Sequence, residues 1–261
     1  MSKLIEELQK VDRTSSQPIG FMTSRQVTAG PRLRLIAAAV PEENIAAEFV
    51  DGADAALLLP GKTRPSVTSI KSSVEPFGGI PWGIYLKDVN SGTISSLTKE
   101  GCDFFIFPAA SQVSAITSDD DTGKIIEVES SLDDGLIRAI NSLPVDAVML
   151  SDTLDKKSPL VWHKLMVFQH LTNLITKPVI ISVTPEAAES DIKALWEAGA
   201  DGIITEINTT KPDGIKNLRK LIDGLPARKL PKKGSSEVLL PYSREAKTSE
   251  PEPEVEEEDW E

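Results

Sequence analysis

Residues 177–207, KPVIISVTPEAAESDIKALWEAGADGIITEI, contain one complete strand–helix–strand unit. Two short runs that are almost continuously apolar, PVIISVT (178–184) and DGIITEI (201–207), enclose a segment with helical periodicity, AESDIKALWEAG (188–199). Pro185 stands where this helix begins, and the segment ends on a glycine. Short, continuous apolar runs are typical of strands that are buried on both faces of a parallel sheet. The stretch therefore predicts a βαβ unit with a right-handed crossover.

The same alternation extends through the preceding sequence. Amphipathic segments, such as EENIAAEFV (42–50), separate short apolar runs between residues 31 and 228. Eight such runs in series predict a (β/α)8 TIM barrel of the α/β class. The runs are LRLIAAAV (33–40), DAALLLP (54–60), WGIYLK (82–87), DFFIFPA (103–109), KIIEVES (124–130), DAVMLSD (146–152), PVIISVT (178–184) and DGIITEI (201–207).

Related tetrapeptides lead into every second strand of this predicted barrel. GADA, GCDF, PVDA and GADG recur at intervals of about 50 residues, the length of two βα steps. Each places an aspartate at the N-terminal end of its strand, which is the face of a TIM barrel that contributes stability rather than catalysis. We interpret these aspartates as structural caps or turn residues: Asp54, Asp103, Asp146 and Asp201.

Segments of different character flank the barrel. Residues 1–30 begin with SKLIEELQKV (2–11), which predicts a short helix that covers the barrel floor. Residues 229–261 form an acidic, Pro- and Glu-rich tail that ends in SEPEPEVEEEDWE. Low hydrophobicity with clustered like charge predicts disorder in this tail. A partner-binding role for the tail is the alternative to a simply solvated one.

The composition restricts the class of protein. The 261 residues carry a formal net charge of −12, which argues against nucleic acid or an anionic membrane as the main partner. A single cysteine excludes an internal disulfide framework, and two histidines leave little for a metal centre, so no metal site is predicted. No apolar run approaches the ~20 residues that span a membrane, and the first residues lack the apolar region of a signal peptide. We expect a cytoplasmic protein, and the sequence identifies no cofactor.

Three residues near the ends of the third and fifth strands are the catalytic candidates, because a TIM barrel builds its ligand site at the C-terminal strand ends. Lys87 could hold an anionic substrate or form a Schiff base; the alternative is that it pairs with a nearby acid in solvent. Glu127 and Glu129 occupy alternate positions, so both are expected to face the lumen. They could act as general acid and base if burial separates their pKa values, or they could neutralise an interior lysine.

Further polar residues follow the later strands, and we expect them to bind the substrate. Asp152 and Glu206 stand at matching ends of the sixth and eighth strands, where each could bind a sugar hydroxyl or a metal, or cap a loop. Ser182 and Thr184 end the seventh strand, and Asn208 follows the eighth. Their hydroxyl and amide groups could donate hydrogen bonds to a substrate.

The stretch at 177–207 resembles the last βαβ portion of aldolase-type barrels, among them the ribulose-phosphate-binding and flavin-dependent groups. The resemblance implies a phosphate site in the turns after the seventh and eighth strands. Here these turns read SVTPEAAES and TEINTTKPDG, without paired glycines. The third strand also resembles the Asp-x-Lys-x-x-Asp motif of orotidine-phosphate decarboxylases, in which the lysine supplies the proton. Tyr85, Lys87 and Asn90 occupy that frame, so the lysine alone matches.

Two functions fit these observations. The first is a small-molecule lyase or isomerase that acts on a carbonyl or sugar-phosphate-like anionic substrate, with Lys87 as electrophile or anion clamp. The second is a non-catalytic binding or scaffold protein whose acidic tail recruits a protein partner. An open, apolar-walled mouth would support the enzyme, whereas a mouth filled by side chains would support the scaffold.

Overall fold

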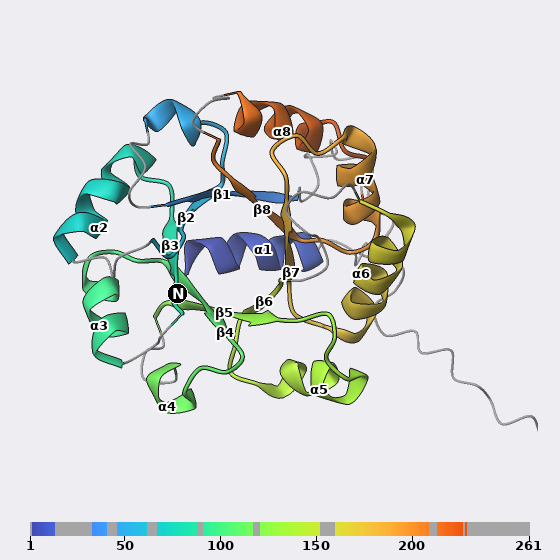
Figure 1. Ribbon diagram of the computed structural model, residues 1–261, viewed down its shortest axis with the longest axis horizontal. Coiled ribbons are helices and arrows are strands. Elements are labelled where there is room, and N and C mark those ends of the chain that lie inside the picture. The colour runs from blue at the N-terminus through green and yellow to red at the C-terminus, as the bar shows by residue number, and fades with distance from the viewer. Residues whose placement is uncertain are drawn as a thin grey trace, which may run out of the picture. The chain divides into compact units, whose positions relative to one another are not determined.

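The eight predicted strands form one closed parallel barrel in the computed structural model of the protein (Figure 1). They pair in sequence order, and the last strand returns to the first. The predicted (β/α)8 architecture is therefore confirmed. The strands are β1 (Arg34–Ala39), β2 (Ala55–Leu58), β3 (Trp82–Tyr85), β4 (Phe104–Pro108), β5 (Gly123–Val128), β6 (Ala147–Leu150), β7 (Val179–Val183) and β8 (Gly202–Glu206).

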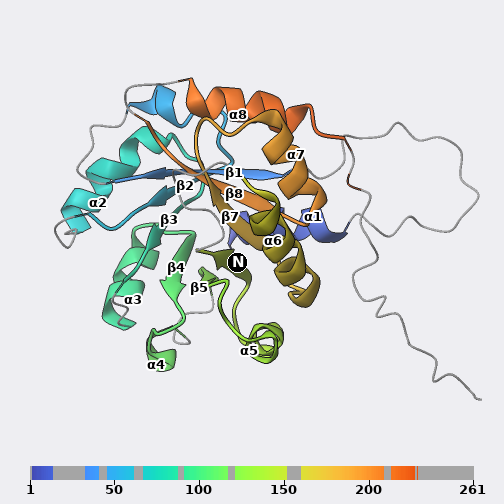
Figure 2. The ribbon, with the colours of Figure 1, turned by 45° about the vertical axis from the view of Figure 1, so that its right-hand side comes forward.

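A helix follows each of the second to eighth strands along the chain, and these helices surround the barrel (Figure 2). The described helices are α1 (Lys3–Arg13), α2 (Val67–Val74), α3 (Ser91–Lys99), α4 (Val113–Ile116), α5 (Asp134–Ala139), α6 (Trp162–Leu174), α7 (Glu189–Glu197) and α8 (Gly214–Asp223), with 3-10 turns η1 (Ala47–Phe49), η2 (Glu75–Phe77) and η3 (Ile140–Ser142). Among them, none has the length and hydropathy needed to cross a bilayer. The structure describes residues 2–13, 33–40, 46–61, 67–87, 91–116, 121–151, 160–208, 213–226 and 228; the predicted tail at 229–261 and the rest of segment 1–30 lie outside this part of the chain.

The segment after β1 differs from the amphipathic helix that the sequence predicted over 42–50. Within its described part, Ala46 is extended, with φ −87° and ψ 152°, and a single 3-10 turn, η1, follows. The chain then turns at Gly52, whose φ of +96° favours glycine. The side chain of Arg219 on α8 packs against this glycine, since a Cβ there would lie 3.3 Å from the Cβ of Arg219.

Alternation along each strand divides the apolar side chains between the barrel interior and the layer beneath the helices. Ile36 of β1 belongs to the inner cluster, whereas its neighbour Leu35 belongs to the outer one. Phe104 of β4 fills the lower part of the interior and is fully buried. Gly83 of β3 makes room for it, because a Cβ at that position would lie 2.4 Å from the Phe104 ring.

Helix α1 closes the floor of the barrel, as the sequence predicted. Its Leu4, Ile5 and Leu8 are buried among the inward-facing residues of the strands. Figure 1 shows the helix crossing the centre of the ring of strands. Gly123 at the start of β5 permits this close approach, because a Cβ there would lie 2.7 Å from Ile5.

Asp103, which directly precedes β4, caps helix α1. Its carboxylate accepts hydrogen bonds from the backbone N–H groups of Lys3 (2.8 Å) and Leu4 (3.0 Å), and from the hydroxyl of Ser2 (2.8 Å). These N–H groups belong to the first turn, where a helix has no partner of its own for them. The negative charge also lies at the positive end of the helix dipole. A residue of the barrel thereby fixes the floor helix in place.

The three other repeated aspartates each join an even-numbered strand to the strand before it. In each case two hydrogen bonds join the aspartate to one residue near the start of the preceding strand. The carboxylate accepts from the backbone N–H of that residue, and the backbone N–H of the aspartate donates to its carbonyl. These contacts agree with the interpretation of the aspartates as structural caps at the floor. The pairs are Asp54 with Leu35 (2.8 Å), Asp146 with Lys124 (2.8 Å) and Asp201 with Val179 (2.9 Å).

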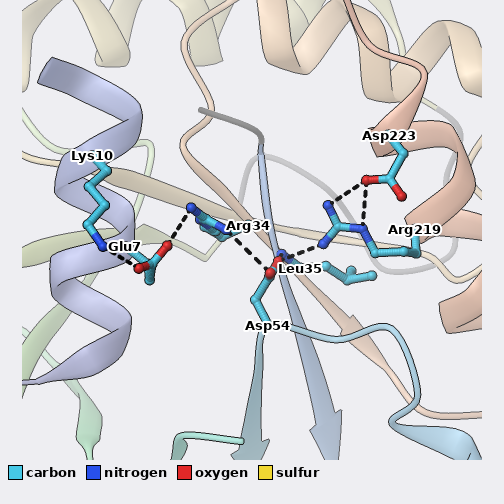
Figure 3. Close-up of polar contacts among 7 residues, drawn as sticks. All are labelled: Glu7, Lys10, Arg34, Leu35, Asp54, Arg219 and Asp223. Carbon is cyan, nitrogen blue, oxygen red and sulfur yellow. Dashed lines mark hydrogen bonds and ion pairs between the residues drawn. The ribbon is translucent and has the colours of Figure 1, made fainter. Parts of the chain in front are cut away.

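A chain of ion pairs surrounds one of these aspartates and connects α1 to α8 (Figure 3). Arg34 lies between Glu7 of α1 (2.6 Å) and Asp54 (3.4 Å). Arg219 of α8 contacts the other oxygen of Asp54 (2.9 Å) and also Asp223 (3.1 Å). Because each arginine bridges two carboxylates, the network links the floor helix, two strands and the last helix.

A second ion pair at the floor is fully buried. Arg228 lies 3.0 Å from Asp201, and the two side chains are 4% and 0% exposed. The guanidinium also stacks on the ring of Trp196 at 4.0 Å and donates to the carbonyl of Ala200. The Trp196 indole in turn donates to the carbonyl of Pro226 (3.0 Å). This pair fastens the segment after α8 to the barrel.

Candidate functional site

A cavity of about 400 Å³ lies at the C-terminal mouth of the barrel. Its volume falls in the range of about 300–1,000 Å³ that is usual for small-molecule sites. The inner apolar residues Ala38, Leu57, Met149 and Ile204 line its lower part. Six polar or ionisable side chains also line it: Tyr85, Lys87, Glu127, Ser151, Ser182 and Glu206.

Tyr85 and Glu127 are joined by a hydrogen bond in which the phenol donates to the carboxylate. Tyr85 ends β3 and Glu127 lies near the end of β5, so β4 runs between them. Along the register, Tyr85 is level with Ile106 of β4 and Ile106 with Ile125 of β5. Glu127 therefore stands two residues further along than Tyr85, one inward layer nearer the mouth.

The environment of Tyr85 keeps its phenol protonated. Burial raises the pKa of Tyr85, and the hydrogen bond to Glu127 and the negative charge of Glu127 raise this pKa further. The ordinary pKa of tyrosine is already near 10. At neutral pH the side chain is therefore a proton donor to Glu127, and it is held in the cavity wall by that bond.

Lys87 and Glu129 both follow the ends of their strands, and the structure separates them. Lys87, two residues beyond the end of β3, is exposed and lines the cavity. β5 ends at Val128, so the chain has left the sheet at Glu129, whose exposed carboxylate accepts a hydrogen bond from Ser131 (3.2 Å). The alternation that predicted a lumenal Glu129 applies only within a strand. The structure thus brings Lys87 and Glu127 to one cavity and leaves Glu129 outside its lining.

Three serine and glutamate side chains from the later strands complete the polar lining. Ser182 of β7 and Glu206 of β8 are partly buried and lie on neighbouring strands. Ser151 directly follows β6, and its hydroxyl donates to the carbonyl of Val128 (3.3 Å). Two of the predicted substrate-binding residues, Ser182 and Glu206, therefore share the cavity with Lys87 and Glu127.

Thr184 and Asn208, two further predicted substrate-binding residues, are not part of the lining of this cavity. The carbonyl of Thr184, just after β7, accepts a hydrogen bond from the Ala187 N–H (3.1 Å) in a turn. Asn208 lines a small separate crevice between the loop after β8 and the start of α8. Glu206 lines both spaces, so this crevice adjoins the cavity. Asp152 lies outside the described residues.

The arrangement favours acid–base chemistry on an organic ligand. Within the described ranges there is no group of three His, Cys, Asp or Glu side chains that could hold a metal ion. His170 pairs with Asp134 (2.9 Å) on the outer face of the barrel, and Cys102 is buried at the floor end of β4. The cavity combines a proton donor and carboxylates with an apolar wall, which is the composition expected of a small-molecule site.

Two polar residues of the lining were not among the sequence candidates. Tyr85 lies on the same inward line as Lys87, so its orientation could be predicted, but its partner is 42 positions away on another strand. Ser151 directly precedes Asp152 and carried no separate signal. The signal for both is their position, since Tyr85 ends β3 and Ser151 directly follows β6.

Comparison with known proteins supports the fold. No protein-family model matches the sequence, and no curated protein matches it either. Among solved structures, a mutant tryptophan synthase α-subunit from Pyrococcus furiosus is similar, with a TM-score of 0.58 and 12% identity over 74% of this chain and 97% of that chain.

Two further enzymes share the architecture. Orotidine 5′-phosphate decarboxylase from Pyrococcus horikoshii has a TM-score of 0.56 and 17% identity, over 72% of this chain and 100% of that chain. N-(5′-phosphoribosyl)anthranilate isomerase from Pyrococcus furiosus has a TM-score of 0.55 and 15% identity, over 74% and 100%. At such low identity the likeness establishes a common aldolase-type TIM-barrel fold, and function has to be argued from the site.

Proposed function

We propose that the protein is a cytoplasmic small-molecule lyase or isomerase that acts on a carbonyl or sugar-phosphate-like anionic substrate at the barrel mouth. The observation that carries this proposal is the open cavity with the Tyr85–Glu127 pair in its wall and Lys87 at its rim. The fold adds support, because two similar structures are by name a decarboxylase of a 5′-phosphate and an isomerase of a phosphoribosyl compound. The open mouth favours this function over that of a scaffold.

The distribution of charge suggests how such a substrate would lie. Lys87 is exposed and can hold an anionic group at the rim. Glu127 and Glu206 would repel an anion, but both accept hydrogen bonds from hydroxyl groups. The neutral, hydroxylated part of the substrate would therefore enter the cavity, where Glu127 transfers a proton and Glu206 and Ser182 bind hydroxyls. Contacts of Glu129, Asp152, Thr184 and Asn208 with substrate stay predictions.

A binding experiment with three probes tests the proposal. Titration calorimetry of the full chain with ribose 5-phosphate, ribose and inorganic phosphate separates recognition of the sugar from that of the anion. The Lys87→Met variant should weaken ribose 5-phosphate about tenfold, the typical effect of losing a charge-assisted hydrogen bond, and leave ribose unchanged. The control is Lys216→Met, which removes an exposed lysine paired with Asp51 on the outer surface. Absence of binding by the wild-type chain would overturn the proposal.

The acidic segment 229–261 supports a second, independent proposal. Its composition, with a terminal acidic run that contains the aromatic Trp260, fits a recruiting segment for a basic protein partner. Deletion of residues 234–261, followed by comparison of the proteins retained in a pull-down, tests this role. An unchanged set of retained proteins would contradict it.

A further inference from the structure

We infer that Tyr85 is a catalytic residue of the mouth cavity, whose phenol oxygen accepts a hydrogen bond from a hydroxyl of the substrate and relays the proton to Glu127. This inference rests on the proposed function and specifies the substrate further. The ligand must present a hydroxyl group, rather than only a carbonyl or an anion, to the wall formed by β3 and β5. It also changes the role of Glu127, which would act through Tyr85 instead of touching the substrate.

The positions of the two residues carry the argument. Tyr85 is partly buried and lines the cavity, and its hydroxyl reaches across β4 to the carboxylate on β5. Below the phenol, Ile106 of β4 is fully buried in the inner cluster. The polar end of Tyr85 therefore has Glu127 on one side and the open cavity on another, above an apolar base.

The chemistry of a phenol determines what this position can do. A tyrosine hydroxyl has one proton and two acceptor lone pairs. Here the proton is donated to Glu127. A phenol that donates its proton in this way still accepts from a third group, and acceptance becomes stronger when its own proton is drawn towards a carboxylate. The complementary group on a ligand is an O–H donor.

The relay conserves atoms and charge. The substrate O–H bond breaks as a new O–H bond forms on Tyr85, while the original phenol proton moves to the Glu127 carboxylate. The products are a substrate alkoxide, a neutral tyrosine and a neutral glutamic acid, without oxidation or reduction. The raised pKa of Tyr85, caused mainly by burial, supports a relay in which the tyrosine passes a proton on rather than remaining ionised. Lys87 lines the same cavity, and its positive charge favours the anionic alkoxide as well as the anionic group held at the rim.

Optical spectroscopy can isolate Tyr85, since the chain has two tyrosines. In the Tyr242→Phe chain, Tyr85 is the remaining phenol, and the double variant Tyr85→Phe/Tyr242→Phe records the contribution of the tryptophans. Ribose 5-phosphate added to Tyr242→Phe should shift the near-ultraviolet tyrosine band, and Glu127→Gln in the same background should reduce this shift. A Tyr85 that the ligand does not contact would give no ligand-dependent shift, and Glu127→Gln would then leave the band unchanged.

Calorimetry supplies the matching thermodynamic measurement. Tyr85→Phe and Glu127→Gln should each weaken ribose 5-phosphate about tenfold, and the double variant should weaken it by little more, because the two residues act as one unit. Tyr242→Phe is the matched control for loss of a phenol and should bind as the wild type does. Circular dichroism confirms that each variant is folded.

The outcomes separate this inference from the proposed function. The relay is overturned, and the enzyme proposal stands, if the wild-type chain binds ribose 5-phosphate but two effects are missing. These are a loss of affinity in Tyr85→Phe and a ligand-dependent shift of the tyrosine band. If the wild-type chain binds none of the three probes, the proposed substrate class fails and the relay fails with it. Additive losses in the double variant would also contradict the relay.

Discussion

Ser2 and Asp103, which are 101 positions apart in the chain, share a 2.8 Å hydrogen bond at the floor of the barrel, with the serine hydroxyl as donor. The same carboxylate accepts from two backbone N–H groups of helix α1. An aspartate of the strand region thus performs the capping function that a residue next to the helix usually performs. Because α1 fills the floor, this contact joins the helix to the start of β4 beneath the inner core.

Replacement of Asp103 by alanine should lower the free energy of unfolding by about 2 kcal/mol, because three hydrogen bonds and a favourable dipole interaction are lost. Asp133→Ala is the matched control. Asp133 caps α5 through one hydrogen bond, to the Gly135 N–H at 2.8 Å, and its loss should lower this free energy by only about 1 kcal/mol. Urea unfolding of both variants measures the difference, and equal losses would contradict the special role of Asp103.

Gly83→Ala should destabilise the protein by roughly 1–3 kcal/mol, because the added Cβ overlaps the Phe104 ring and its carbonyl oxygen inside the closed barrel. Gly224→Ala at the end of α8 is the control, since its Cβ would meet neighbouring carbonyl oxygens at ordinary distances of 3.5 and 3.6 Å. Thermal unfolding of the two variants compares them. A Gly83→Ala protein as stable as the control would show that Phe104 can shift without penalty.

Arg228→Met should lower the free energy of unfolding by about 3 kcal/mol or more, because it removes the cation from beside the fully buried carboxylate of Asp201. Lys216→Met breaks an exposed pair with Asp51 (3.4 Å) and should change stability by less than about 1 kcal/mol. Denaturant titration measures both values. The Arg228 pair would be unimportant if the two variants were equally stable.

Tyr85 should titrate well above the ordinary tyrosine pKa in the folded protein. In the Tyr242→Phe chain, phenolate absorbance should rise near pH ~10 when the protein is unfolded in urea, and only at higher pH when it is folded. Glu127→Gln should bring the folded pKa of Tyr85 part of the way back, since burial, the largest cause of the shift, remains. A folded chain that titrates like the unfolded one would refute the assignment.

The same raised pKa has a consequence for stability. A group whose pKa is higher in the folded state holds its proton there after the unfolded chain has lost it, so stability declines as pH rises above the unfolded pKa of about 10. Unfolding experiments at pH values from neutral to alkaline should show this decline in Tyr242→Phe. The decline should be smaller when Tyr85 is also replaced by phenylalanine, and an identical decline would contradict the link.

The sequence predicted the strands more reliably than the site. Runs such as PVIISVT are apolar on both faces, and that pattern specifies a buried parallel strand without knowledge of its neighbours. The site depends on where each strand ends. Glu129 was predicted to face the lumen, but β5 ends one residue earlier, at Val128, so the alternation no longer applies to it. In the described part of segment 42–50, an extended Ala46 and a single 3-10 turn replace the predicted helix, and nine residues carry too little periodicity to reveal this. The importance of Tyr85 depends on a partner two strands away, which no local pattern contains.

Both ends of the described chain are fastened beneath the barrel, Ser2 by Asp103 and Arg228 by Asp201. The cavity opens at the other end of the strands. Immobilisation on a solid support through a linkage directly before Ser2 or directly after Arg228 would therefore orient the protein with the mouth of the cavity directed into solution. Attachment after Arg228 is preferable, because Ser2 is only 3% exposed and a handle there would crowd the α1 cap.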